Sequence, residues 1–189
     1  MKKTEKFVLV LTSGGIDSTA CVNFYKKMKF HVEGIFFDYG QASNKKEHAA
    51  VEAIGKYYKI PIKKITLTNN IKYQDGLIPG RNAFLYFGAL MNFNNKNGII
   101  SSGIHSGTPY YDCSKKFLTE IQAIVDQYCQ GVIKIEAPFL SFNKKEIWDY
   151  CLLEKVPLEL TYSCELGKKQ PCGKCSTCKD LQKLYASKK

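Results

Sequence analysis

Short apolar runs alternate with amphipathic segments along most of the 189-residue chain. Apolar runs that are too short for helices predict five strands, at 6–12, 32–37, 61–67, 98–102 and 132–137. Between them, helical spacing of apolar residues predicts helices at 17–29, 43–58 and 143–153, with two more after Pro79 and after Ser114. Strands that alternate with helices in this way form a parallel, doubly wound α/β sheet.

The stretch after the first predicted strand reads Thr12-Ser13-Gly14-Gly15-Ile16-Asp17-Ser18-Thr19. Adjacent glycines permit a sharp turn and a close backbone approach to a ligand. The helix that follows presents unpaired N–H groups and the positive end of its dipole, which suits phosphate. Ser13, Ser18 and Thr19 add hydroxyl donors, and Asp17 can cap the helix or help to hold a metal carried by a nucleotide. An ordinary capped turn explains a bare Ser-Gly-Gly equally well, but neither a Walker loop nor a dinucleotide fingerprint explains the full string.

Further candidates follow the other predicted strands, at the sheet edge where open α/β folds bind ligands. Asp38 and Tyr39 lie where they could contact a ribose or an adenine, although a simple turn explains them equally well. Arg81 is the one arginine among 28 basic residues and falls in a first helical turn, where a cation needs an anionic partner. It is therefore a candidate for a phosphate or carboxylate contact, with an exposed arginine as the alternative. The long loop 103–114 has the composition of a functional loop, and its His105 is interpreted as a solvated loop histidine rather than a substrate contact.

Four of the eight cysteines are clustered near the end of the sequence with the spacing Cys-x7-Cys-x2-Cys-x2-Cys. They are Cys164, Cys172, Cys175 and Cys178. Four thiolates satisfy a tetrahedral zinc ion completely, which predicts a structural site. An iron–sulfur cluster is the main alternative. The polar tail from Lys179 is predicted to form a short helix beside this cluster.

The length predicts one main domain at 1–160 and a small cysteine-bearing segment at 161–189. Neither a membrane span nor a signal peptide is apparent, which predicts a cytoplasmic protein. The net charge of +11 comes from scattered lysines, which favours a lysine-rich surface over a nucleic-acid footprint. The positive electrostatic field of these lysines still attracts an anionic substrate such as ATP.

Several motifs occur in order along nearly the whole chain. They are Ser13-Gly14-Gly15-Ile16-Asp17-Ser18, Phe37-Asp38-Tyr39-Gly40-Gln41, Pro79-Gly80-Arg81-Asn82, Tyr111-Asp112-Cys113, Lys144-Lys145-Glu146-Ile147-Trp148 and the four-cysteine cluster. Together they resemble the 7-cyano-7-deazaguanine synthase (QueC) family of PP-loop ATP pyrophosphatases, with an adenine nucleotide alpha hydrolase-like fold. The phosphate loop resembles the superfamily as a whole, whereas Pro-Gly-Arg-Asn and the cysteines resemble this family specifically.

The resemblance implies that ATP adenylates the carboxylate of 7-carboxy-7-deazaguanine, that ammonia forms an amide, and that a second adenylation dehydrates the amide to a nitrile. It implies ATP with Mg²⁺, structural Zn²⁺, and a homodimer. The implied catalytic residues are Ser13, Asp17, Ser18, Arg81 and Lys144. The implied nucleotide site contains Thr12, Ser13, Gly14, Gly15, Asp17, Ser18, Thr19, Asp38 and Tyr39. The implied substrate contacts are Gln41, Arg81, Asn82, His105, Tyr111 and Asp112.

Two segments depart from the family pattern, and both lie where the substrate base is expected. The stretch 68–78 is short, and 105–110 replaces the family's Glu-Thr-Asp-Phe-Ser-Gly. A QueC-like ligase that joins the deazaguanine carboxylate to another amine, such as a protein N-terminus in antiviral defence, is therefore an alternative. A PP-loop tRNA-modifying enzyme and a non-enzymatic nucleotide-binding module are two others, although the chain leaves no room for an added RNA-binding domain.

Overall fold

The computed structural model describes residues 6–67, 78–105 and 107–186. Its strands are β1 (Phe7–Leu11), β2 (His31–Asp38), β3 (Ile62–Thr66), β4 (Gly98–Ser101) and β5 (Ile133–Glu136). Its helices are α1 (Ile16–Lys27), α2 (Asn44–Tyr58), α3 (Arg81–Met91), α4 (Lys115–Cys129), α5 (Lys144–Leu153) and α6 (Ser176–Ala186), with short 3₁₀ turns at Tyr111–Cys113 and Leu158–Leu160. The predicted strands and helices are confirmed to within a few residues, and of the short stretch 68–78 only residue 78 is among the described residues.

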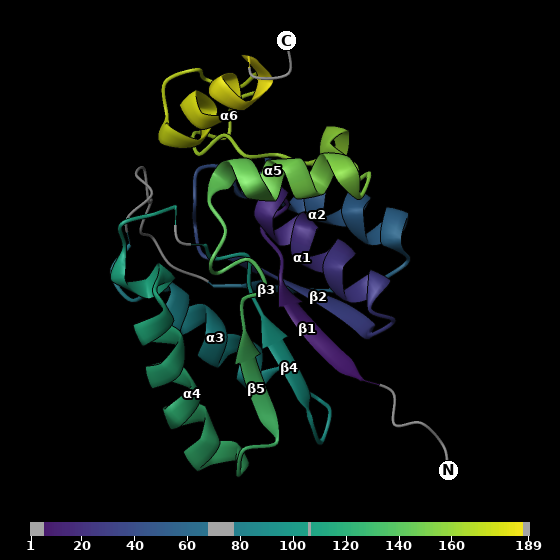
Figure 1. Cartoon of the computed structure of the whole chain (residues 1–189), viewed down its shortest axis with the longest axis vertical. Helices are drawn as coiled ribbons and strands as arrows, with labels where there is room; N and C mark the ends of the chain where they lie inside the picture. The colour runs from purple at the N-terminus through teal and green to yellow at the C-terminus, as the bar shows by residue number, and fades with distance from the viewer. Residues whose placement is uncertain (1–5, 68–77, 106, 187–189) are drawn as a thin grey trace.

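The strands form one parallel sheet in the order β3-β2-β1-β4-β5, which confirms the doubly wound α/β class (Figure 1). Alternate residues of β1 face opposite layers. Val8 and Val10 pack with α1 and α5, whereas Phe7 and Leu9 pack with α3 and α4. Helices therefore cover both faces of the sheet, as parallel sheets require.

The strand order reverses beside β1, because the chain moves outward through β2 and β3 and then returns to β4 on the other side. The loops after β1 and β4 consequently leave the sheet next to each other. This switch point is where open α/β sheets bind their ligands. A Cβ added to Gly103, just after β4, would lie 2.7 Å from the carbonyl carbon of Asp17, so the two loops are in direct backbone contact.

The start of α5 is fixed by a capping box. The Asn143 side chain accepts the Glu146 N–H at 3.0 Å, and the Glu146 carboxylate accepts the Asn143 N–H at 2.7 Å. Lys144 is thereby held in the first helical turn, where its side chain reaches the carboxyl edge of the sheet.

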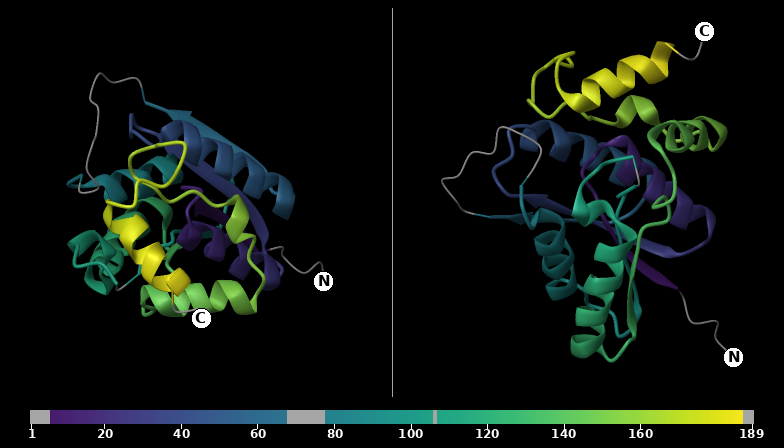
Figure 2. Two further views of the ribbon diagram at one scale, coloured as in Figure 1. Left: turned by 90° about the horizontal axis from the view of Figure 1, so that it is seen from above. Right: turned by 60° about the vertical axis from the view of Figure 1, so that its left-hand side comes forward.

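The last helix packs on the main body, at one end of the molecule (Figure 2). Leu184 of α6 is buried in the same core as β1 and α1, and the rings of Trp148 and Tyr185 meet edge to face at 5.0 Å. The predicted terminal helix is confirmed, but it begins three residues earlier than Lys179 and includes Cys178. The division into units at 1–160 and 161–189 stays a prediction.

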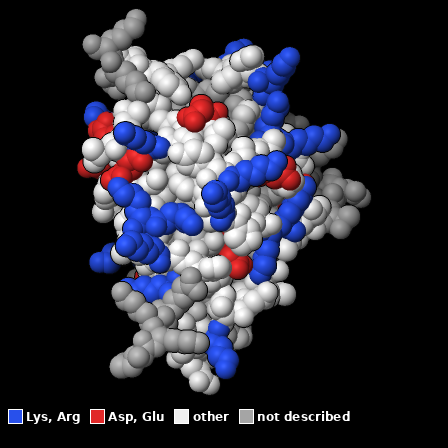
Figure 3. Space-filling model, turned by 90° about the vertical axis from the view of Figure 1, so that its right-hand side faces the viewer, with Lys and Arg blue, Asp and Glu red and all other residues white. Residues whose placement is uncertain are grey.

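Basic side chains are spread over the face shown in Figure 3, with neutral surface and a few carboxylates between them. On this face the distribution agrees with the predicted surface of scattered lysines. Among the described helices, none combines the length and the apolar character needed to cross a bilayer.

Candidate functional site

A cavity of about 420 Å³ lies at the carboxyl edge of the sheet. Its floor is the loop after β1, and its sides come from the start of α3, the loop after β4, Lys144 of α5 and the segment around the cysteines. Apolar side chains of Leu11, Ile35, Phe37, Leu85 and Ile104 form part of the lining. Cavities of this size with an apolar wall and a few polar groups commonly bind small molecules.

The phosphate-type loop owes its shape to internal hydrogen bonds. Gly14 has φ +74°, and a Cβ there would lie 2.7 Å from the Glu47 carbonyl oxygen, so only glycine fits. The Ser18 hydroxyl accepts the Ser13 N–H at 3.2 Å and donates to the Gly15 carbonyl at 3.1 Å. The Thr19 hydroxyl donates to that same carbonyl at 2.8 Å. The hydroxyls therefore preorganise the loop before any ligand binds.

The loop residues divide into two groups by position. Those that line the cavity are Thr12, Ser13, Gly15, Ile16, Asp17 and Ser18. Gly14 and Thr19 are not among the described lining residues, and they shape the turn from behind. Thr12 also supports the turn, because its hydroxyl donates to the Ile35 carbonyl at 3.0 Å.

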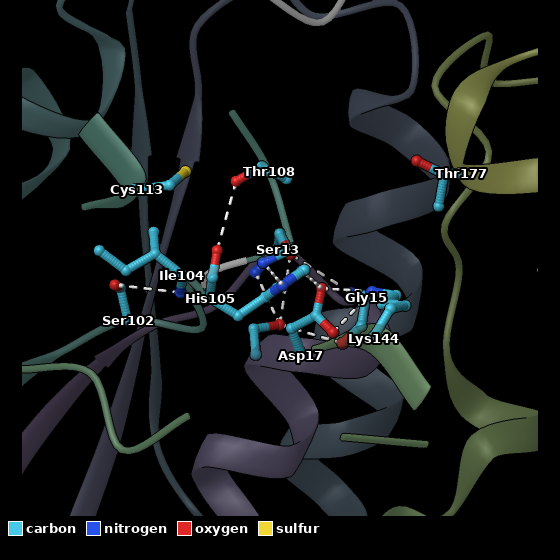
Figure 4. Close-up of polar contacts among 12 residues, drawn as sticks. Ser13, Gly15, Asp17, Ser102, Ile104, His105, Thr108, Cys113, Lys144 and Thr177 are labelled. Atoms are coloured by element: carbon cyan, nitrogen blue, oxygen red, sulfur yellow. Dashed lines mark hydrogen bonds and ion pairs between the residues drawn. The ribbon is translucent and has the colours of Figure 1, made fainter. Parts of the chain in front are cut away.

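Asp17 does not cap α1, contrary to the sequence prediction. Gly15 occupies the N-cap position, and no side-chain hydrogen bond caps α1 in the described structure. The Asp17 carboxylate instead forms an ion pair with Lys144, whose Nζ lies 2.6 Å from both carboxylate oxygens (Figure 4). This contact across 127 residues joins the first turn of α1 to the first turn of α5.

His105 lies beside this ion pair and is only 8% exposed. Its Nδ1 accepts the Gly107 N–H at 3.0 Å, which leaves the proton on Nε2, 3.8 Å from an Asp17 oxygen. Burial lowers the pKa of His105 below its ordinary 6.5, against the opposing effect of Asp17. The interpretation of His105 as a solvated loop residue was wrong, because the loop folds back onto the first turn of α1 and buries most of the ring at the cavity wall.

Arg81 and Asn82 both line the cavity from the start of α3. The buried Asn82 side chain donates to the Asp112 carbonyl at 3.1 Å and so ties α3 to the loop after β4. The thiol of Cys113 lines the same wall, and burial raises its pKa.

The residues after β2 contribute mainly to local structure. Gln41 reaches the cavity lining, but its amide donates to the Phe37 carbonyl and to Glu47, each at 3.0 Å. Tyr39 lines the cavity, whereas Asp38 is absent from the described lining and accepts hydrogen bonds from Gly40 and Asn44. In the described structure, Asp38 therefore stabilises a local turn, which was the alternative to a nucleotide contact.

Two predicted substrate contacts lie away from the described cavity lining. Tyr111 is 57% exposed and donates to Glu120, and Asp112 offers its backbone carbonyl to Asn82. The neighbouring Tyr110 and Cys113 line the cavity instead, because the short 3₁₀ turn rotates Tyr111 outward.

Sequence reasoning missed the contribution of the cysteine-bearing segment to the cavity. The lining residues from this segment are Tyr162, Ser163, Glu165, Ser176, Thr177 and Asp180. The backbone N–H of Tyr162 donates to the Gly14 carbonyl at 2.8 Å, which places the segment directly on the phosphate loop. The polar residues around the cysteines were the only available signal, and their spacing says nothing about which surface they reach.

The four clustered cysteines converge as predicted. Their sulfur atoms all lie within 4.8 Å of one another. Backbone N–H groups of Lys174 and Cys175 point at the Cys172 sulfur at 3.4 and 3.3 Å, and they lower the pKa of that thiol to about 6. This donor set suits a thiolate-binding metal ion.

Solved structures of other proteins share this arrangement of strands and helices. The U34-tRNA thiolase NcsA from Methanococcus maripaludis, determined with its [4Fe-4S] cluster, gives a TM-score of 0.59 at 17% identity, over 98% of this chain and 66% of that one. A 4-thiouridine synthetase in complex with RNA and ATP gives a TM-score of 0.58 at 17% identity, over 96% and 50%. These likenesses show that the chain has the adenine nucleotide alpha hydrolase-like fold that the sequence predicts.

The family described as "Queuosine biosynthesis protein QueC" matches residues 7–75 and 66–188. A 7-cyano-7-deazaguanine synthase of Prochlorococcus marinus (strain MIT 9215) is 32% identical over 98% of this chain and 96% of that protein. A synthase of the same name from Campylobacter jejuni subsp. jejuni serotype O:6 is 29% identical over 92% and 90%. The chain belongs to the QueC family of queuosine biosynthesis proteins, and the relatives that it matches are enzymes.

Proposed function

We propose that this protein converts 7-carboxy-7-deazaguanine into 7-cyano-7-deazaguanine with ATP and ammonia. The observation that carries the proposal is the 32% identity to a 7-cyano-7-deazaguanine synthase over 96% of its length. The cavity supports it, because a loop suited to phosphate and an apolar wall suited to a heterocycle line the same space.

The first half of the proposed reaction makes an amide. A carboxylate oxygen attacks the α-phosphorus of ATP, and the bond to the β-phosphate oxygen breaks, so that pyrophosphate leaves and an acyl adenylate remains. Ammonia then attacks the acyl carbon, AMP leaves with the original carboxylate oxygen, and one proton is released.

The second half removes the amide oxygen. That oxygen attacks a second ATP and releases pyrophosphate. Loss of AMP and of the two N–H protons then gives the nitrile. Oxygen departs as part of AMP in both halves, so the chemistry needs two ATP molecules and no redox partner.

The residues at the cavity floor are suited to charge stabilisation rather than to covalent catalysis. Backbone N–H groups and hydroxyls of the Ser13–Ser18 loop, with Lys144 and Arg81, would neutralise the charge that develops on pyrophosphate. Asp17, now paired with Lys144, would help to hold Mg²⁺ carried by the nucleotide once the lysine turns to phosphate. The Cys113 thiol is held neutral by its raised pKa, which favours a mechanism without a cysteine nucleophile.

We also propose that the cysteine cluster holds zinc. The sulfurs of Cys172 and Cys178 are 3.8 Å apart. With zinc–sulfur bonds of about 2.3 Å, an ideal tetrahedron has edges of about 3.8 Å. With four thiolate ligands the ion has no open position, so its proposed role is to fold this segment.

The test is to incubate the purified protein with Mg-ATP and 7-carboxy-7-deazaguanine, with and without ammonium, and to measure AMP, pyrophosphate and the base product by mass spectrometry. We expect AMP release that depends on the base and a nitrile product that depends on ammonium. Pyrophosphate release that stops at an acyl adenylate, with no AMP set free by ammonium, would indicate a different amine acceptor. Absence of base-dependent AMP release would refute the proposed substrate. Sedimentation of the same sample tests the predicted homodimer.

A further inference from the structure

The cysteine-bearing segment forms one wall of the cavity, opposite the loop that carries Thr108 and Cys113 (Figure 4). It is firmly placed there. Tyr162 is hydrogen-bonded to Gly14, and a Cβ on Gly167 would overlap the Ala42 carbonyl oxygen at 2.2 Å. The segment that carries the metal ligands therefore also presents polar side chains to the cavity.

Glu165 is the most constrained polar side chain of this wall. One carboxylate oxygen, Oε1, accepts the Ser176 hydroxyl at 2.8 Å and the Thr177 hydroxyl at 2.7 Å. The other oxygen, Oε2, has no hydrogen-bond or ion-pair partner among residues 6–67, 78–105 and 107–186. Two hydroxyls at the start of α6 therefore orient a half-buried carboxylate that lines the cavity and keeps an unused acceptor.

The cavity lining consequently offers two chemically different kinds of group. Lys144, Arg81 and the phosphate loop supply cations and N–H donors for anions, whereas Glu165 supplies an acceptor. In the proposed reaction the substrate carboxylate must lie beside the α-phosphate, among the cations and N–H donors. The opposite edge of a guanine-type ring carries N–H donors, namely the ring N1–H and the exocyclic amino group.

We propose that Glu165 is a specificity-determining residue that accepts hydrogen bonds from the N–H edge of the guanine-type substrate. This inference rests on the proposed function. It also explains how the site avoids misplacing ATP, because the N1 atom of adenine is an acceptor and would face the carboxylate unfavourably. A carboxylate matched to N–H donors rejects analogues that lack them, since the bound analogue would desolvate its half-buried acceptor without pairing it.

The experiment compares the wild-type protein with Glu165→Gln and with the control Glu159→Gln. Glu159 lies in the 3₁₀ turn just before the cysteine-bearing segment, is exposed, and does not belong to the described cavity lining. Base-dependent AMP release is measured with 7-carboxy-7-deazaguanine and with the analogue in which hydrogen replaces the exocyclic amino group.

For Glu165→Gln we expect KM for the base to rise about tenfold to a hundredfold, the range for a hydrogen bond to a charged group, with KM for ATP within about twofold. The wild-type protein should lose about tenfold or more in kcat/KM with the analogue, and Glu165→Gln only about threefold or less. Glu159→Gln should behave like the wild type with both bases.

Equal losses with the two bases in wild type and Glu165→Gln, or an unchanged KM for the base, would overturn the inference. Failure of the proposed function is distinct, because the wild-type protein would then release no AMP in response to either base. Metal content and thermal unfolding verify that each variant is folded. Should Glu165→Gln lose its metal, Thr177→Val removes one orienting hydroxyl without changing charge. That variant should raise KM for the base severalfold, and an unchanged KM would equally refute the role.

Discussion

Gly103 gives the sharpest test of the contact between the two loops at the switch point. An alanine methyl group there would lie 2.7 Å from the carbonyl carbon of Asp17 and 2.8 Å from the Ser18 nitrogen. Ordinary contacts of this kind begin at 3.4 Å, so one side must retreat by about 0.7 Å. The obstructing atoms are backbone atoms of α1 and cannot rotate away. We therefore expect the loop after β4 to move.

This displacement should affect stability moderately and activity strongly. Overpacking of this size costs about 1–3 kcal/mol of unfolding free energy. The moving loop carries His105 and the cavity wall, and a misplacement of about 1 Å can reduce turnover about a hundredfold. We expect Gly103→Ala to lower kcat/KM by about tenfold to a hundredfold while the protein remains folded.

Base-dependent AMP release and urea unfolding measure the two effects separately. Gly131→Ala is the matched control, because Gly131 has φ +73° and its nearest neighbours to an added Cβ are 3.8 and 3.9 Å away. That control should lose about 1–2 kcal/mol of stability from backbone strain alone and keep its activity. A Gly103→Ala protein with kcat/KM within about twofold of the wild type would refute the reasoning about loop placement.

Three other expectations follow from single contacts. Lys144→Met should reduce pyrophosphate release about a hundredfold, whereas Lys145→Met, which removes only a pair with Asp149, should stay near the wild type. Cys175→Ser should abolish metal binding, measured by elemental analysis, and lower the unfolding temperature, while Cys129→Ser outside the cluster should keep the metal. Because burial holds the folded-state pKa of His105 below 6.5, the unfolded chain takes up that proton first, so stability should fall as pH drops below 6.5. His105→Gln should flatten this dependence in urea titrations at pH ~7.5 and ~5.5, and an unchanged slope would contradict the assignment.

Local patterns were sufficient for the features that depend on neighbouring residues. The sheet class, the turn at Gly14 and the start of α5 each follow from spacing and residue type within a few positions. The cysteine cluster was equally predictable, because Cys-x2-Cys spacing brings thiols together in almost any tight turn.

The remaining features depend on distant segments. Asp17 looked like a cap because no local pattern shows that Lys144 approaches it from 127 residues away. The burial of His105 and the outward rotation of Tyr111 depend on how one irregular loop folds, and periodicity does not describe such loops. Glu165 reaches the cavity because its segment is hydrogen-bonded to the distant Gly14, which no local pattern shows.

The burial of Leu184 in the same core as β1 also bears on how the protein is made. The first strand and the phosphate loop leave the ribosome early, but the layer that contains them stays incomplete until residue 184 has emerged. Domains that are complete early can fold during synthesis. Here the growing chain carries an unfinished apolar face until α6 has been made, so we expect the native core to form only after that helix is released.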